Sequence, residues 1–245
     1  MNNLLLLGLI IVTLAILWLL ARRIKRGDLT ITLRPLAGYQ LIQRQIGQAV
    51  ESGSTVHMSM GRASLIAHKA ATSFAALQIL DFLAEKGGRN NSPPAVTVGE
   101  GTLLPAAEDS LRQQARYGSV QPNGRVQFVA DENHPFAFAS GVVNDLERKG
   151  AASYVATGHQ GAELALIGFA AQKNEVDQLV ATDDPAGLAV ATAVSEEQLI
   201  GEDIFAAGAY LSNKPHAMAS LLLQDVGRWL IAAIILVLAL VQLFT

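Results

Sequence analysis

Two apolar runs without a single charged residue lie near the ends of the chain, over Leu4–Leu20 and Trp229–Phe244. All 18 Lys and Arg residues and all 21 Asp and Glu residues lie between them. Because a helix rises about 1.5 Å per residue, each run nearly matches the hydrocarbon thickness of a bilayer once its flanks sit at the headgroups. We therefore predict one transmembrane helix at each end, with a domain between them that is large enough to have a full core.

The composition excludes several classes of protein. Two apolar runs are too few for a multi-span transporter. The chain has no Cys, which excludes a secreted disulfide scaffold and thiol catalysis and fits a reducing cytoplasm. Its formal net charge of −3 excludes a basic nucleic-acid binder. We therefore expect no nucleic acid among its partners.

The basic residues near the first run set the expected orientation. Met1, Asn2 and Asn3 ahead of the run carry no side-chain charge, whereas a secretory signal has positive charge there, so we predict a retained anchor. The positive-inside rule places the basic end of this run in the cytoplasm. We therefore expect a two-span protein of the inner membrane with a cytoplasmic main domain, both termini outside and the lipid bilayer as a partner. The expected membrane-surface residues are Arg22, Arg23, Lys25, Arg26, Arg228 and Trp229.

The second run has an alternative interpretation as a buried core helix. Leu230–Val241 is apolar on every face, which favours a membrane span. Neither run contains an ionisable residue, whereas a proton or ion path needs one, so we interpret both runs as anchors. A transport subunit whose pore forms only on oligomerisation is a further alternative, with Thr13 and Gln242 as its only polar lining.

Short β-branched runs alternate with helical patterns from Thr55 onward. Apolar residues recur three and four positions apart after several of these runs, as at Leu104, Ala107 and Leu111. Repeated strand–helix units favour a mostly parallel sheet with helices on both faces, which is a Rossmann-like α/β fold. The predicted strands are Thr55–Met60, Ala95–Val98, Arg125–Val129, Ala152–Ala156 and Asp177–Ala181.

The segments that flank the predicted sheet complete the domain organisation. Leu29–Leu33 has the pattern of an edge strand, and the helix predicted over Tyr39–Ala49 has an apolar face that docks on the sheet or lies near the membrane. Ser195–Leu211 predicts one long helix, and Ala217–Gln224 predicts another that leads into the second span. The division is 4–20 for the first span, 21–54 for the basic juxtamembrane segment with its strand and helix, 55–212 for the α/β domain, 213–228 for the juxtamembrane helix and 229–244 for the second span.

Polar residues and glycines follow the predicted strands, at the edge where open parallel sheets bind ligands. In Thr157–Glu163, glycines flank His159, so backbone amides there could approach an anion while His159 hydrogen-bonds it. Arg62 is the candidate counter-charge. The alternative is a tight turn with a capped helix, a solvated His159 and a surface ion pair of Arg62. The candidate ligand-binding residues are Arg62, Gly99, Glu100, Asp131, Gly158, His159, Gly161 and Asp183.

No catalytic or metal-binding constellation is complete in the sequence. The acidic residues after the strands could converge on a divalent cation with His134, but Asp and Glu are also favoured at helix N-termini and no close ligand spacing is present. Ser59 and Ser64 near Gly61 have no assignable base, which argues against a serine hydrolase. We therefore expect no metal, no cofactor and no catalytic residue. The acidic residues considered for a cation are Glu100, Asp131, Asp183 and Asp184.

The order of four segments resembles a family of bacterial membrane-anchored proteins that contain a domain of unknown function. The resemblance covers nearly the whole region between the spans and implies no activity, cofactor or catalytic residue. Its segments are Leu33–Leu36 after the first anchor, Val56–Gly61, Val96–Gly99 and, most distinctive, Gly201–Leu211 before the second anchor.

Two functions from different classes follow from these features. The first is a non-enzymatic scaffold that forms homo-oligomers at the inner face of the membrane, in which the Ala- and Gly-rich segment Ile204–Leu211 packs between neighbours. The second is a binding or enzymatic domain for a nucleotide or another anionic small molecule, with Gly158, His159 and Gly161 as its cradle and Arg62 as counter-charge.

Overall fold

The computed structural model describes residues 2–67, 69–115 and 124–244. The chain forms two compact units. The α/β unit is Pro35–Ala207, and the helical unit consists of Met1–Arg34 together with Gly208–Thr245.

The α/β unit is built on a six-stranded sheet in which every paired strand is parallel. The strand order is β3-β2-β1-β4-β5-β6, so the direction of winding reverses between β1 and β4. This confirms the predicted Rossmann-like parallel sheet. The strands are β1 Val56–Ser59, β2 Ala95–Val98, β3 Val126–Phe128, β4 Ser153–Thr157, β5 Asp177–Thr182 and β6 Glu197–Ile200.

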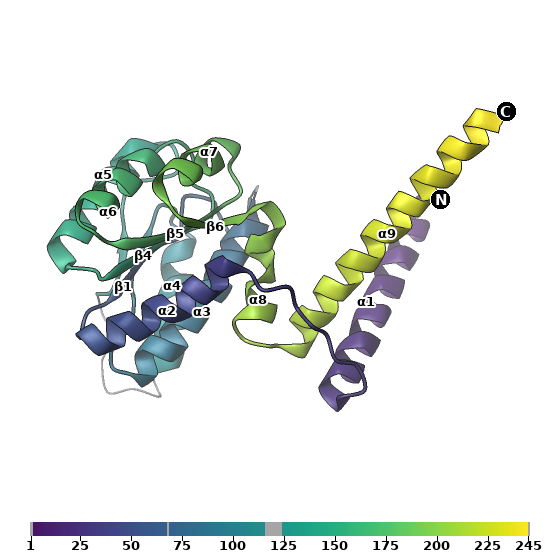
Figure 1. Ribbon diagram of the computed structural model, residues 1–245, viewed down its shortest axis with the longest axis horizontal. Helices are drawn as coiled ribbons and strands as arrows, with labels where there is room; N and C mark the ends of the chain where they lie inside the picture. The colour runs from purple at the N-terminus through teal and green to yellow at the C-terminus, as the bar shows by residue number, and fades with distance from the viewer. Residues whose placement is uncertain (1, 68, 116–123, 245) are drawn as a thin grey trace. The chain divides into compact units, whose positions relative to one another are not determined.

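Helices cover both faces of this sheet, with α5, α6 and α7 on one face and α2, α3 and α4 on the other (Figure 1). Pro135 and Pro185 stand in the first turns of α5 and α7, where the missing proline N–H leaves no helical hydrogen bond unmade. The helices are α2 Ala37–Ser52, α3 Ala70–Arg89, α4 Leu103–Ala115, α5 Pro135–Lys149, α6 Leu164–Lys173 and α7 Pro185–Val194.

The core lies on both sides of the sheet. Phe138, Tyr154 and Ile167 are fully buried under α5, α6 and α7. On the other face α2 docks on the sheet with Tyr39 and Ile42 buried, and the Tyr39 hydroxyl donates to the carbonyl of Asp203 at 2.6 Å. Of the two positions expected for this helix, the structure has the one on the sheet.

The prediction of one long helix over Ser195–Leu211 is wrong. Glu197–Ile200 forms β6, which pairs with β5, and it is followed by the 3₁₀ helix η1 Gly201–Ala206 and the short helix α8 Ala207–Tyr210. Gly201 has a φ of +59°, which ends the strand. The apolar spacing suits a helix, but pairing with the open edge of β5 outweighs the local preference.

The edge strand predicted over Leu29–Leu33 is also wrong, because this segment has no regular structure. It belongs to the helical unit, whereas the sheet lies in the α/β unit and has β3 and β6 as its edges. A β-branched run without a partner strand has nothing to pair its backbone groups with, so the pattern alone does not make a strand.

The helical unit contains two long apolar helices that contact each other, α1 Asn2–Arg26 and α9 Pro215–Phe244. They run antiparallel (Figure 1), and both are long and apolar enough to cross a membrane. Thr13 donates its hydroxyl to the carbonyl of Ile10 at 2.8 Å, which satisfies this polar group within the helix. The residues expected as a juxtamembrane helix and a second span form one continuous α9.

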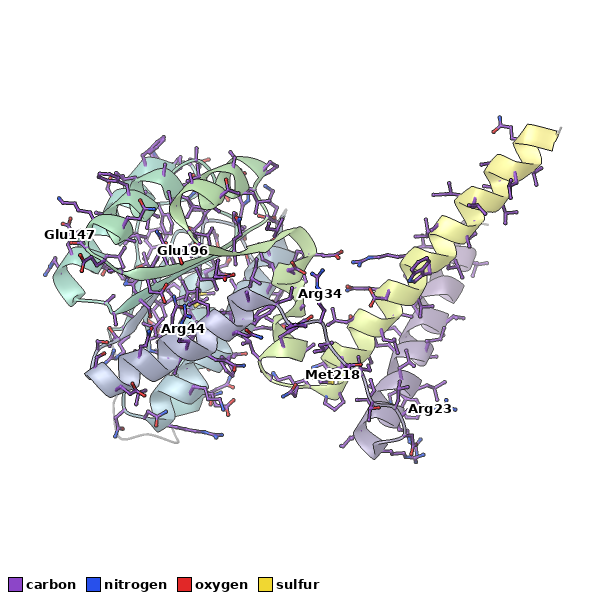
Figure 2. The ribbon with its side chains drawn as sticks, viewed as in Figure 1. Arg23, Arg34, Arg44, Glu147, Glu196 and Met218 are labelled. Carbon is purple, nitrogen blue, oxygen red and sulfur yellow. The ribbon has the colours of Figure 1, made fainter. Side chains whose placement is uncertain are left out.

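The expected membrane-surface residues lie on these two helices. Arg23 lies near the end of α1 (Figure 2), and the guanidinium of Arg22 stands 5.2 Å from the ring centre of Trp18. On α9, Arg228 contacts Asp225 at 3.4 Å, and Trp229 is exposed. Such Trp and Arg neighbours are common where a helix passes from hydrocarbon to headgroups.

Candidate functional site at the carboxyl edge of the sheet

The loops after β1 and β4 contact each other where the strand order reverses. The amide of Arg62 donates to the carbonyl of His159 at 3.1 Å. Gly61 and Gly158 have φ values of +71° and +93°. A Cβ on Gly61 would lie 2.6 Å from the His159 carbonyl oxygen, and a Cβ on Gly158 would overlap the Met60 carbonyl. Both glycines are therefore needed because two backbone segments approach this closely.

His159 lies in a cluster of charged and polar groups from three segments of the chain. Its Nδ1 is 2.8 Å from a carboxylate oxygen of Asp183, and its Nε2 is 2.9 Å from the ammonium of Lys69. Thr72 donates its hydroxyl to the other Asp183 oxygen at 2.8 Å. The imidazole therefore lies between the Asp183 carboxylate and the Lys69 ammonium, with a carboxylate oxygen of Asp184 3.6 Å from its Nε2.

The cluster favours a charged Asp183 carboxylate. Burial is the largest single effect and raises the pKa of Asp183. Hydrogen bonds from His159 and Thr72, together with the electrostatic effects of His159 and Lys69, outweigh it, so the pKa is lowered. Since Thr72 lies in the first turn of α3, this carboxylate lies at the positive end of that helix dipole.

Arg62 forms an ion pair that is almost fully buried. Its Nε and Nη2 donate to one carboxylate oxygen of Glu163 at 2.9 and 2.7 Å, and its Nη1 donates to the carbonyl of Glu132. The side chains of Arg62 and Glu163 are only 13% and 3% exposed. The charge predicted to meet a ligand is thus neutralised within the protein.

Three other acidic residues at this edge bond to backbone amides at the start of a helix or in the turn before one. Glu100 accepts from the amide of Thr102 at 2.7 Å just before α4, and Asp184 accepts from the amide of Ala186 at 2.8 Å at the start of α7. Asp131 accepts from Asn133 and contacts His134 Nδ1 at 2.5 Å just before α5; the hydrogen bond with His134 is the main cause of its lowered pKa. Of these residues Asp184 is a helix N-cap, which the sequence offers as the alternative to a cation site, whereas Glu100 and Asp131 hold the turns that precede α4 and α5.

A buried polar network holds the loop after β4. The side-chain amide of Gln160 donates to the hydroxyl of Ser59 at 2.9 Å, and that hydroxyl is 2.5 Å from the Tyr154 hydroxyl. Thr182 donates to the Gln160 carbonyl at 2.7 Å. Burial raises the pKa of Tyr154 well above its ordinary value, so this phenol stays protonated. The loop is therefore fixed to β1, β4 and β5.

The structure brings together most of the predicted site residues. Arg62, Gly158, His159, Gly161 and Asp183 lie in the contacting loops after β1, β4 and β5. Gly99 joins them, because its amide donates to the Gly61 carbonyl at 2.9 Å, whereas Glu100 and Asp131 bond within the separate turns before α4 and α5.

Three residues of this edge were not among the predicted ones. Lys69 and Thr72 arrive from the start of α3, and Glu163 completes the ion pair. Glu163 follows the glycine-containing turn directly, which is the only sequence signal for any of them.

A separate hollow of about 290 Å³ lies at the opposite edge of the sheet, near the starts of β5 and β6. Arg44 and Asp177 line it and approach each other to 3.7 Å. Within the described ranges, no group of three or more His, Asp or Glu side chains is arranged to hold a metal ion, here or at the carboxyl edge.

No curated protein and no solved structure matches the chain. One family model matches residues 1–245, in agreement with the resemblance to a domain of unknown function. The chain therefore belongs to the family described as Domain of unknown function (DUF6754).

Proposed function

We propose that this protein is a non-catalytic assembly component, anchored by α1 and α9 in the inner membrane, whose α/β unit self-associates at the cytoplasmic face. One observation carries the choice over a ligand-binding function. The carboxyl edge of the sheet is filled by the protein's own charged groups, with Asp183 at the start of α3 and Glu163 on Arg62.

The position of Asp183 is the central point. In folds with this strand order, the helix after β1 directs its N-terminus at the phosphates of a dinucleotide. Here the helix after β1 is α3, and the carboxylate of Asp183 bonds to Thr72 in its first turn. A phosphate would have to displace a carboxylate that also bonds to His159, which argues against an anionic ligand.

The charge of the whole edge supports the same conclusion. Arg62 and Lys69 are both engaged with neighbouring side chains, and acidic residues outnumber them. An anion that approached this edge would meet net negative charge. The acidic residues of the edge are Glu100, Asp131, Glu132, Glu163, Asp183 and Asp184.

The test of the proposed function is the mass of the full chain in a native-like bilayer. We expect the chain, reconstituted in lipid nanodiscs or extracted in mild detergent, to form particles with two or more copies of the chain at nanomolar concentration. Native mass spectrometry or mass photometry measures the number of copies. Nanodiscs without protein and a single-copy membrane protein of similar size serve as controls. Particles with one copy at every concentration would contradict self-association.

The strand order itself favours one alternative, a domain that binds a nucleotide or another anionic metabolite, because the order reverses between β1 and β4. It predicts that a phosphorylated compound raises the melting temperature of the full chain, and that Arg62→Ala with His159→Ala removes this shift. If no compound in a nucleotide panel stabilises the wild-type chain, this alternative fails.

A further inference from the structure

The charges of the chain are unevenly divided between its two units. Of the 18 basic and 21 acidic residues, the helical unit contains seven and two, which leaves 11 and 19 for the α/β unit. The chain as a whole is acidic, yet the unit with the two membrane-length helices is basic. The basic residues of the helical unit are Arg22, Arg23, Lys25, Arg26, Arg34, Lys214 and Arg228.

Most of these basic residues lie at one end of the helix pair. Because α1 and α9 run antiparallel, the last turns of α1 lie at the same end as the start of α9, as the positions of Arg23 and Met218 show (Figure 2). Lys214 directly precedes α9. We name this exposed cluster the basic collar; it consists of Arg22, Arg23, Lys25, Arg26 and Lys214.

Backbone hydrogen bonds hold the basic collar at the two helix ends. Gly27, with a φ of +80°, ends α1, and the amide of Asp28 closes the last turn by donating to the Arg23 carbonyl at 3.1 Å. At the start of α9, the amide of Met218 donates to the Lys214 carbonyl at 3.1 Å. The first turn of α9 contains no acidic residue, so the positive end of its helix dipole adds to the charge of the collar.

The basic collar is not neutralised by carboxylates of the chain. Within the part of the chain that the structure describes, none of its five members forms an ion pair. Arginines of the α/β unit, in contrast, have carboxylate partners at Arg44, Arg62, Arg89 and Arg112. Like charges held close together repel one another, so an anion from outside the chain stabilises the collar.

Trp18 indicates the depth of the collar in a bilayer. The guanidinium of Arg22 stands 5.2 Å from the ring centre of Trp18, which is 59% exposed. Trp is enriched where a helix passes from hydrocarbon to headgroups, and an Arg one turn further along extends its guanidinium toward the phosphates. The anions that the collar meets at this depth are therefore lipid phosphates.

We propose that the basic collar binds the headgroups of anionic phospholipids in preference to zwitterionic ones; the inference rests on the proposed anchoring by α1 and α9 but not on self-association. In a zwitterionic headgroup an ammonium group neutralises the phosphate, whereas an anionic headgroup keeps a net negative charge that complements the collar. The net negative charge of the α/β unit disfavours its own contact with such lipids. The collar is thus the part of the chain that this lipid class fits.

Quenching of Trp18 fluorescence by brominated lipid measures the preference. The chain has two Trp residues, so Trp229→Phe leaves Trp18 as the only one, next to the collar. This full chain is reconstituted in phosphatidylcholine vesicles with the same small mole fraction of either brominated phosphatidylglycerol or brominated phosphatidylcholine. We expect the anionic lipid to associate at Trp18 at least about threefold more strongly at low salt, and this preference to disappear in about 1 M salt, which screens the charges.

Neutral substitutions assign the preference to the collar. In the same Trp229→Phe background, we expect Arg23→Gln, Lys25→Gln and Arg26→Gln together to abolish the preference. The matched control removes the same charge from exposed positions of the α/β unit and should keep the preference; its changes are Lys86→Gln, Arg148→Gln and Lys173→Gln. A preference that survives in the collar variant would overturn the assignment to the collar.

Two other outcomes separate the lipid inference from the proposed function. Equal quenching of Trp18 by the two brominated lipids would overturn the preference for anionic headgroups and leave the anchoring standing. An absence of quenching by either lipid would place Trp18 outside the bilayer and overturn both. Neither outcome changes the number of copies per particle, which is measured separately by mass.

Discussion

At the residue scale, the most consequential contact is the buried pair of Arg62 and Glu163. The glycine-flanked turn before α6 and the end of β1 predict that Arg62 and His159 lie at one edge of the sheet, and the structure has them in contacting loops. Their partners were not predictable, because Glu163 lies 101 residues from Arg62 and Thr72 lies 111 residues from Asp183. A single sequence gives no signal for such distant pairs.

The buried ion pair predicts a large cost for removing one partner. We expect Glu163→Ala to lower the free energy of unfolding by about 3–5 kcal/mol, because it leaves the guanidinium buried without its counter-charge. Glu108→Ala, which breaks the exposed pair of Glu108 and Arg112, should cost less than about 1 kcal/mol. Urea titration of the solubilised full chain, followed by circular dichroism, measures both. Equal losses in the two variants would contradict the assignment.

Asp183 predicts a pH-dependent part of the stability. Because the pKa of Asp183 is lower in the folded chain, its charged carboxylate stabilises the fold fully at pH values above the ordinary carboxyl pKa of about 3.9. This stabilisation disappears as the pH falls through the lowered pKa of the folded state. We expect Asp183→Asn to reduce the urea midpoint at pH 7 and the gap to the wild type to narrow below about pH 4. A difference in urea midpoint between the two proteins that stays constant down to pH 3 would show that the charge of Asp183 does not cause the stabilisation.

At the element scale, the contacting loops after β1 and β4 decide what the edge of the sheet can do. Five of the six strands, and most of the helices, follow from apolar periodicity and from Pro and Gly at their ends. The sixth strand does not, because Glu197–Ile200 has a spacing that also suits a helix and becomes a strand only through its pairing with β5. The segment Ile204–Leu211, expected to pack between neighbours, begins with Ile204 and Ala206 buried in η1, which packs on α3.

The close approach of these loops predicts different effects for two glycines. Gly158 and Gly53 both have positive φ, but a Cβ on Gly158 would overlap the Met60 carbonyl, whereas no atom lies within 4 Å of a Cβ on Gly53. We expect Gly53→Ala to cost about 1 kcal/mol through backbone strain alone. Gly158→Ala should cost about 2 kcal/mol more. Thermal unfolding of the two variants measures the difference, and equal melting temperatures would mean that the loops separate easily.

At the scale of the whole molecule, the apolar runs predict the two long helices, and the structure has them as α1 and α9. The side of the membrane on which the α/β unit lies is still a prediction from Arg22, Arg23, Lys25 and Arg26. It follows from these four basic residues and the positive-inside rule.

Cysteine labelling tests this orientation. Glu147 on α5 is exposed (Figure 2), and the chain has no Cys of its own. We expect a membrane-impermeant maleimide to label Glu147→Cys only after cells are permeabilised and to label Asn2→Cys in intact cells. The unaltered chain controls for background. Labelling of Glu147→Cys in intact cells would contradict the predicted orientation and place the α/β unit outside the cytoplasm.

The antiparallel pairing of α1 and α9 has a practical consequence. Both ends of the described chain lie at the same end of the pair (Figure 1), so peptides fused there would lie close to each other. The halves of a split fluorescent protein, one fused at each end, should therefore reassemble within one molecule. Their fluorescence would report that α1 and α9 pair, independently of the side of the membrane on which the two ends lie.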